Sequence, residues 1–263
     1  MARFKAHFKA FNDRYTLIGG TACFLSMDQV GLDFRATKDL DIVLCVEALG
    51  ADFVNAFWDF IRQGQYKNQQ KSTGRMLFYR FYDPEDDTFP IMLELFSRTP
   101  DALQLQNDSH LTPIPMGEAA SSLSAILLDD DYYRFILDGK QEIDGLPVVG
   151  PAHLIPLKAR AWLDMTQRRN QGETIDERDI RKHRNDVFRL YQLLSPDSAL
   201  EMPDMVRGDL QRFINAMTGE PSIQLKSFGL KNTTLEELLG QIRTIYGLDH
   251  QRGRSTLPSS KRR

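Results

Sequence analysis

The sequence predicts an α/β (α+β) fold: a small mixed sheet with flanking helices, followed by a helical half. Short apolar runs typical of strands alternate with helical patterns up to about residue 150. Beyond that point the apolar residues recur mainly at helical spacing. The chain has 263 residues, of which 41% are hydrophobic, and this is enough to fill a core. We therefore expect a first domain over residues 1–150, a helical domain over 151–250 and a basic, disordered tail over 251–263.

The first elements alternate between helix and strand. Phe4, Phe8 and Phe11 recur at helical spacing and predict a short amphipathic helix over residues 4–14. A strand is expected at Tyr15–Ile18, and the glycine pair that follows breaks it and starts a helix. The further elements expected are a helix at Thr21–Gln29, a strand at Asp39–Val46, a helix over 49–63, and strands at Met76–Tyr82 and Ile91–Phe96. Together they give a mixed sheet with helices packed on it.

The later elements are mostly helical. A turn at Asp144-Gly145 precedes the apolar run Leu146–Val149. Pro151 suits the first turn of a helix, because the N–H group that proline lacks has no helical partner there. The expected segments are a strand at Leu123–Leu128 and helical segments at Tyr132–Leu137, Pro151–Gln167, Ile175–Leu194, Met205–Met217 and Thr234–Tyr246.

Composition limits the class of protein. The net charge of −3 provides no whole-protein attraction for nucleic acid, although a local basic patch stays open. Cys23 and Cys45 fall in expected helix and strand interiors and indicate reduced core residues rather than a disulfide. No apolar run is long enough to span a bilayer, and the charged start lacks the apolar core of a signal peptide. We expect a soluble cytoplasmic protein with no membrane partner.

Two carboxylates behind a glycine turn carry the strongest functional signal. Asp39 and Asp41 lie two residues apart in an expected strand, so their side chains point to the same face. Neighbouring carboxylates repel, and Mg²⁺ suits them because it binds through one or two carboxylates and substrate phosphates. The turn Gly19-Gly20-Thr21 offers backbone N–H groups to such phosphates. The alternative is an Asp-Leu-Asp sequence that merely opens an exposed strand.

A third carboxylate lies in an apolar strand. Glu94 is the single charge within Ile91–Phe96, and an unpaired charge is costly to bury. It is therefore a candidate metal ligand, or a base that activates an attacking hydroxyl. The alternatives are a charge facing solvent at a sheet edge, or a salt bridge to Arg80 or Arg98.

Three basic residues are candidates for phosphate binding. Arg35 and Lys38 precede the two aspartates and could contact triphosphate oxygens, the alternative being solvated loop charge. Lys158 lies one turn into a largely apolar helix and could also reach a nucleotide phosphate. Its alternative is a lysine at the helix rim that extends its ammonium to water.

These residues together resemble a known superfamily. Gly19-Gly20-Thr21, the pattern Arg35-x-Thr37-x-Asp39-x-Asp41 and Glu94 resemble the nucleotidyltransferases of the polymerase-β type. Within that superfamily the chain looks most like the AbiEii-type nucleotidyltransferases, the toxin components of bacterial abortive-infection and toxin–antitoxin systems. The second half adds to this resemblance through Leu157-Lys158-Ala159-Arg160 and the charged segment from Arg178 to Val187. The resemblance covers roughly residues 15–195.

The resemblance implies a Mg²⁺-dependent transfer of a nucleoside monophosphate from an NTP to an acceptor hydroxyl. One or two Mg²⁺ ions would bind to Asp39 and Asp41, and Glu94 would promote attack on the α-phosphate. Some members of the superfamily act on tRNA 3′ ends, so tRNA or another RNA is an expected acceptor, and a cognate antitoxin is an expected partner. The implied nucleotide-binding residues are Gly19, Gly20, Thr21, Arg35, Thr37 and Lys158, with the helical domain completing the cleft.

The chain departs from the family pattern in three places. The interval between Gly20 and Asp39 is longer than the commonest spacing. The usual Gly-Ser is replaced by Gly-Gly-Thr, a frequent variant. Glu94 stands where an Asp is often found, and its longer reach leaves open whether it is a ligand or a base.

A charged helix face offers further cleft candidates. Asp179, Lys182, His183 and Asp186 are spaced at i, i+3, i+4 and i+7, which brings them to one side of a helix. In the functional interpretation Asp179, Lys182 and Asp186 face the nucleotide or its acceptor. In the alternative, Asp179 pairs with His183 and Lys182 pairs with Asp186 on a solvated surface. His183 is disfavoured as a metal ligand, because no second histidine lies at ligand spacing.

Two other functions compete with the toxin-type enzyme. One is a nucleotidyltransferase that modifies a small hydroxylated molecule, as the aminoglycoside-modifying enzymes do. The other is a protein of the same fold that binds nucleotides or partners without catalysis. Retention of all three carboxylates argues against the second.

Overall fold

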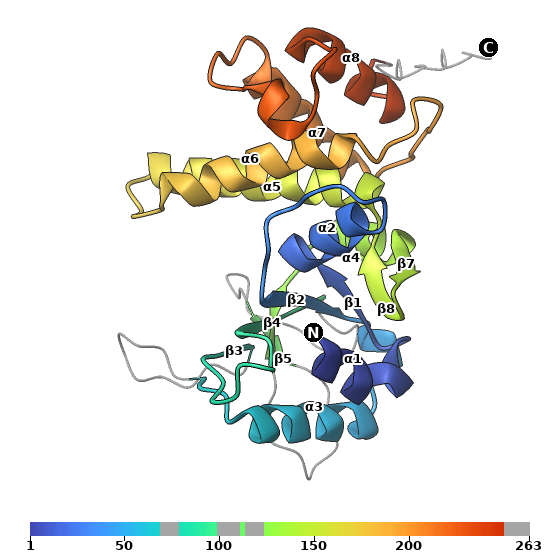
Figure 1. Cartoon of the computed structure of the whole chain (residues 1–263), viewed down its shortest axis with the longest axis vertical. Coiled ribbons are helices and arrows are strands. Elements are labelled where there is room, and N and C mark those ends of the chain that lie inside the picture. Colours follow the sequence, from blue (N-terminus) through green and yellow to red (C-terminus); the bar gives the residue numbers. More distant parts are fainter. Residues whose placement is uncertain (69–78, 99–110, 114–123, 250–263) are drawn as a thin grey trace, which may run out of the picture.

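The computed structural model describes residues 1–68, 79–98, 111–113 and 124–249, and it confirms the expected mixed α/β class (Figure 1). A sheet crosses the middle of the molecule, with helices on both sides of it. The strands are β1 (Tyr15–Ile18), β2 (Asp39–Leu44), β3 (Arg80–Tyr82), β4 (Met92–Ser97), β5 (Leu111–Pro113), β6 (Ser124–Leu127), β7 (Lys140–Ile143) and β8 (Leu146–Val149). The helices are α1 (Ala2–Phe8), α2 (Gly19–Asp28), α3 (Ala51–Gly64), α4 (Asp130–Asp138), α5 (Pro151–Asn170), α6 (Glu177–Tyr191), α7 (Asp204–Met217) and α8 (Leu235–Ile245).

The sheet has the strand order β5-β6-β4-β2-β1-β8-β7, and β3 pairs with β4 outside this path. β2 runs parallel to β4 and antiparallel to β1. β8 runs parallel to β1 and forms an antiparallel hairpin with β7. The sheet therefore extends past the first hundred residues, and β2 lies near its centre.

Aromatic packing fixes one face of the sheet. Phe53, Phe57 and Phe60 recur along α3 and are all buried, as the helical spacing predicts. They contact Phe4 and Phe8 of α1 with ring centroids 5.7 to 6.1 Å apart, which is within the usual range for favourable aromatic pairs. Figure 1 shows α1 and α3 together on the side of the sheet away from α5–α8.

The hairpin β7–β8 leads from the sheet to the helical half. Asp144 and Gly145 form its turn with positive φ angles of 48° and 66°, so the predicted turn is confirmed. Gly150 then precedes α5, whose first residue is Pro151, as expected. α5 packs against α6 and α7, and α2 contacts both α5 and α6. α2 therefore connects the sheet with the helices above it (Figure 1).

Some predicted boundaries differ from the observed ones. The helix predicted over 4–14 ends at Phe8 and continues as a 3₁₀ turn, η1 (Lys9–Phe11). α2 begins at Gly19 rather than Thr21, because the glycine pair forms the first turn of the helix instead of preceding it. Cys45 follows β2 rather than lying within it, and a second 3₁₀ turn, η2 (Val46–Ala48), comes next. Both cysteines are buried and free, as predicted.

Parts of several predictions fall outside the described residues. These are the start of the strand at Met76–Tyr82, the first residue of the strand at Leu123–Leu128, and the tail at 251–263. In the helical half, a third 3₁₀ turn, η3 (Leu225–Phe228), joins α7 to α8. No helix among the described residues is both long and apolar enough to cross a lipid bilayer.

Candidate functional site

Three carboxylates lie together at one end of two neighbouring strands. Asp39 and Asp41 open β2, and Leu40 and Ile42 alternate with them as buried core residues. The parallel register of β2 and β4 sets Asp41 directly opposite Glu94. The expected placement of the third carboxylate on a neighbouring strand is therefore confirmed, and the lateral spacing of strands brings the two side chains close.

The start of α2 is pressed against Asp41. A Cβ atom added to Gly19 would lie 1.7 Å from Asp41 Oδ2, and the φ angle of Gly19 is +69°. Any other residue would collide with the carboxylate and would also be strained, so the position requires glycine. Burial, reinforced by the negative charge of Glu94, raises the pKa of Asp41 to about 6.

The remaining residues of the glycine turn are held by the loop before β2. A Cβ atom on Gly20 would lie 3.2 Å from Thr37 Oγ1, so Thr37 packs against this turn of α2. Thr21 is buried, and its hydroxyl donates a hydrogen bond of 2.7 Å to the backbone carbonyl of Asp39. Thr21 therefore ties α2 to the first residue of β2.

Arg80 pairs with Glu94 from the other side. The two residues are cross-strand partners in the antiparallel pair β3–β4. Arg80 Nε donates to Glu94 Oε1 at 2.6 Å, and Nη2 contacts the same oxygen. Of the two salt bridges considered for Glu94, the one to Arg80 is observed, whereas Arg98 pairs with Glu47 at 2.6 Å.

A second charged cluster is centred on Asp186 of α6, which is fully buried. Its Oδ2 atom lies 2.9 Å from Arg35 Nη2 and 3.2 Å from Lys158 Nζ of α5. Arg189 approaches the other carboxylate oxygen at 3.5 Å. Lys158 is only 3% exposed, so the alternative of a lysine at the helix rim is wrong.

The electrostatics of this second cluster follow from burial and charge. Burial alone would lower the pKa of Lys158, yet this pKa is raised, because Cys23, Asp186 and Asp41 favour the charged ammonium. Burial, together with the charge of Lys158, lowers the pKa of His183 to about 3. The Nδ1 atom of His183 is buried and has no hydrogen-bond partner among the described residues. His183 is therefore a neutral imidazole at neutral pH.

The charged face predicted on α6 is divided. Asp179 is exposed, whereas Asp186, two turns further on, is buried. In the described part of the chain no ion pair joins Lys182 to Asp186, so that surface pair is wrong. The positive charges of Lys158 and Lys182 both favour the ionised form of Asp41. The two clusters are therefore electrostatic neighbours, and Asp179 lies outside them.

The donor set allows a test of whether the site suits Mg²⁺. Asp39 and Asp41 supply oxygen donors on one face, and Gly19 leaves the space that the Asp41 carboxylate fills. Within the described ranges, no group of three or more His, Cys, Asp or Glu side chains is arranged to hold a metal ion. The pair thus fits an ion that completes its shell with phosphate and water oxygens, and it does not fit a cage of three protein carboxylates.

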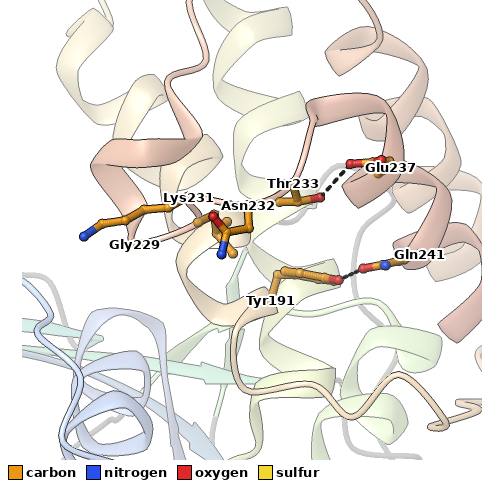
Figure 2. Close-up of a pocket in the computed structure, with 8 residues that line it drawn as sticks. Tyr191, Gly229, Lys231, Asn232, Thr233, Glu237 and Gln241 are labelled. Carbon is orange, nitrogen blue, oxygen red and sulfur yellow. Dashed lines mark hydrogen bonds between the residues drawn. The ribbon is translucent and has the colours of Figure 1, made fainter.

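A hollow of 660 Å³ lies elsewhere, in the helical half. Figure 2 shows its lining residues from the end of α6, the segment after η3, and α8. Thr233 bonds to Glu237 at 3.3 Å, and Tyr191 bonds to Gln241, so four of the polar side chains that line the hollow are paired with one another. None of the carboxylates or cations described above lines it, and we do not assign the chemistry to it.

Comparisons with known proteins identify no family and no function for this chain. No family model matches the chain, and no curated protein matches it. Among solved structures, the chain is similar to "Crystal structure of JHP933 from Helicobacter pylori" at 16% identity and a TM-score of 0.35. The match covers 93% of this chain and 88% of that one. A TM-score this low assigns no shared fold and no shared function.

Arg80 and Arg189 are the site residues that sequence reasoning underestimated. The sequence indicates Arg80 only as an alternative partner for Glu94, and it does not single out Arg189. The role of Arg80 follows from the antiparallel register of β3 and β4, which no local sequence pattern predicts. The signal for Arg189 is its i,i+3 spacing from Asp186, which is visible in the sequence.

Proposed function

We propose that this protein is a Mg²⁺-dependent nucleotidyltransferase that moves a nucleoside monophosphate from an NTP to an acceptor hydroxyl. The observation that carries the proposal is the close placement of Asp39 and Asp41 beside Glu94, with the first turn of α2 against Asp41. Transfers at phosphorus depend mainly on positioning and charge neutralisation. A cluster of carboxylates next to a backbone turn and several cations supports that chemistry.

Each residue has a defined task in this proposal. Asp39 and Asp41 hold the ion, which neutralises phosphate charge when it is bound. The backbone N–H groups at Gly19 and Gly20 face the triphosphate, a role for which the start of a helix is suited. Thr21 keeps α2 and β2 in register through its bond to Asp39.

The cations of the helical half supply the remaining positive charge. Lys158 and Lys182 act electrostatically on Asp41 and would stabilise a triphosphate bound beside it. Arg35 approaches from the loop before β2 and is held by Asp186. Asp186 therefore positions Arg35 and Lys158, and it is not itself a ligand of the ion in this proposal.

Incorporation of label from α-³²P-labelled NTPs tests the proposal. Asp41→Asn keeps the size of the side chain and removes its charge, and we expect at least a 1000-fold loss of incorporation, in the range of about 4 kcal/mol. The matched control is Asp28→Asn, because Asp28 is exposed at the end of α2. Full activity in a folded Asp41→Asn variant would refute the proposal.

The acceptor is proposed to be RNA, in a toxin-type enzyme that acts on tRNA. This finer proposal rests on the resemblance in the sequence. Total RNA, purified tRNA and a set of aminoglycosides are each incubated with the four labelled NTPs. Label on tRNA that depends on Asp41 supports the proposal. Label on an aminoglycoside alone would replace it with the small-molecule alternative.

A non-catalytic nucleotide-binding protein is the second candidate, and one observation favours it. Arg80 occupies Glu94, and Asp186 holds Arg35 and Lys158, so three expected site residues are engaged inside the protein. This candidate predicts saturable NTP binding by equilibrium dialysis with no incorporation into any acceptor. Label transfer that is lost in Asp41→Asn excludes it.

A further inference from the structure

The pairing of Arg80 with Glu94 bears on how many metal ions the site can hold. Arg80 Nε lies 2.6 Å from Glu94 Oε1, and Nη2 contacts the same oxygen. The Glu94 side chain is 12% exposed, whereas that of Arg80 is 44% exposed. The carboxylate is therefore mostly enclosed, whereas the arginine paired with it is partly exposed.

The register of β2, β3 and β4 determines which charged groups lie next to Glu94. Glu94 faces Asp41 on β2 and Arg80 on β3, so it lies between a carboxylate and a cation. An ion that bridged Asp41 and Glu94 would have to approach the guanidinium closely. Two cations repel, and this repulsion is strong where solvent is partly excluded.

We propose that Arg80 is a positioning residue that serves as the fixed counter-ion of Glu94, so that the carboxylate face takes one divalent ion, at Asp39 and Asp41. This inference rests on the proposed function, because it concerns the ion of that site. It agrees with the absence, among the described residues, of a three-carboxylate metal group. A guanidinium donates hydrogen bonds and cannot lose its charge near neutral pH, so Arg80 stays a charged partner of Glu94 over that range.

The proposal predicts how Mn²⁺ binding responds to neutral substitutions. In Arg80→Gln, Glu94 loses its cation and becomes available as a ligand. We expect Mn²⁺ to bind about tenfold more tightly, or a second Mn²⁺ to bind. In Arg80→Gln/Glu94→Gln a neutral pair replaces a charge-balanced pair, and we expect an affinity within about twofold of the original chain. Free Mn²⁺ is measured by electron paramagnetic resonance, with no nucleotide and no activity assay.

Two further variants make the test decisive. Arg62→Gln removes an arginine paired with Asp59 on α3, so it controls for loss of one positive charge elsewhere. Arg80→Lys keeps the charge and is expected to keep the stoichiometry of one ion. Circular dichroism establishes that each variant is folded. If Arg80→Gln does not fold, the double variant decides the question, because loss of Mn²⁺ binding in it would identify Glu94 as a ligand and overturn the inference.

The outcomes separate this inference from the proposed function. If the original chain binds one Mn²⁺, loses it in Asp41→Asn and is unchanged in folded Arg80→Gln, the inference alone fails. If the original chain binds two ions, the inference also fails while the proposed function stands. If neither the original chain nor Arg80→Gln binds Mn²⁺, with or without an NTP, both fail.

Discussion

The two charged clusters of this protein each contain an aspartate, half-buried Asp41 on the strands and fully buried Asp186 on the helices, and the surroundings of the two differ. On the strands, Asp41 has a carboxylate as its neighbour, and the nearby cation Arg80 is directed to Glu94 instead. On the helices, Asp186 is in contact with cations from three separate segments. The strand cluster has more carboxylates than cations, whereas in the helix cluster three cations surround one carboxylate.

The two aspartates differ in how strongly their surroundings favour the ionised carboxylate. Burial and Glu94 raise the pKa of Asp41 to about 6, so its ionised form is disfavoured in the folded protein. Asp186 remains fully buried because Lys158 and Arg35 contact it directly. A like-charged cluster costs folding free energy unless a cation from outside compensates it, whereas a paired cluster holds elements together. The comparison indicates that the helix cluster stabilises the packing of three segments. The strand cluster keeps carboxylates without matching cations, which is the property that the proposed ion site needs.

The largest effect is expected from opening the helix cluster. Asp186→Ala leaves Lys158 buried and Arg35 without its carboxylate, and we expect a loss of about 3 to 5 kcal/mol in the free energy of unfolding. Urea unfolding followed by circular dichroism measures it. The matched control is Asp179→Ala on the same helix, where an exposed side chain should change stability by less than about 0.5 kcal/mol. Equal effects at the two positions would contradict the division of the α6 face.

The strand cluster was predictable from the sequence because its geometry is local. Residues two apart in a strand share a face, so Asp39 and Asp41 could be paired without knowledge of the fold. Glu94 could be singled out because a charge within an apolar run needs a partner. The identity of that partner could not be predicted, since the register of β3 against β4 depends on residues distant in the sequence.

The helix cluster was predictable only in part. The spacing of α6 correctly grouped Lys182, His183 and Asp186, but the burial of Asp186 depends on how α5 and α2 pack against α6. Lys158 is 28 residues and Arg35 is 151 residues away from Asp186 in the sequence (186 − 158 and 186 − 35). No local sequence pattern can therefore predict these ion pairs. Long-range ion pairs of this kind become visible only when the helices are assembled.

Removing an aspartate charge from the strand cluster is expected to raise the free energy of unfolding, whereas Asp186→Ala in the helix cluster lowers it. Asp41→Asn removes a charge that the folded state disfavours, so it should stabilise the protein above pH 6 in the absence of divalent ions. The sign follows from linkage. The folded pKa of about 6 exceeds the ordinary value of 3.8, so the stabilising contribution of protonated Asp41 is complete below 3.8 and is lost as the pH rises through 6. We expect a difference near zero at pH 4 and about 2 to 3 kcal/mol at pH 8.

The control for this prediction is again Asp28→Asn, which removes an exposed aspartate and should not change the pH dependence. Thermal unfolding in EDTA at a series of pH values provides the measurement. An Asp41→Asn variant that is less stable than the original chain at pH 8 would show that a protein cation compensates Asp41, and the contrast between the clusters would disappear.

The smallest of these effects is expected at His183, and it tests the helix cluster by pH. Burial and Lys158 lower its pKa to about 3, below the ordinary value of 6.5. Folding therefore favours the neutral ring, and this contribution is present above pH 6.5 and is lost as the pH falls towards 3. Lys158, Lys182 and Arg35 all oppose its protonation, and only Asp186 favours it. We expect a loss of about 2 kcal/mol between pH 7.5 and pH 5 in the original chain.

His183→Gln keeps a neutral polar side chain and should remove this loss. Urea unfolding at pH 7.5, 6 and 5 gives the slope for both chains. The dependence of the unfolding free energy on pH has the opposite sign to that expected for Asp41. Folding disfavours the protonated form of His183, whereas it favours the protonated form of Asp41. In the double variant Asp41→Asn/His183→Gln, both contributions should vanish together. If the unfolding free energy of the double variant still falls between pH 7.5 and pH 5, another group of the helix cluster titrates in this range. The charges assigned to the helix cluster would then be wrong.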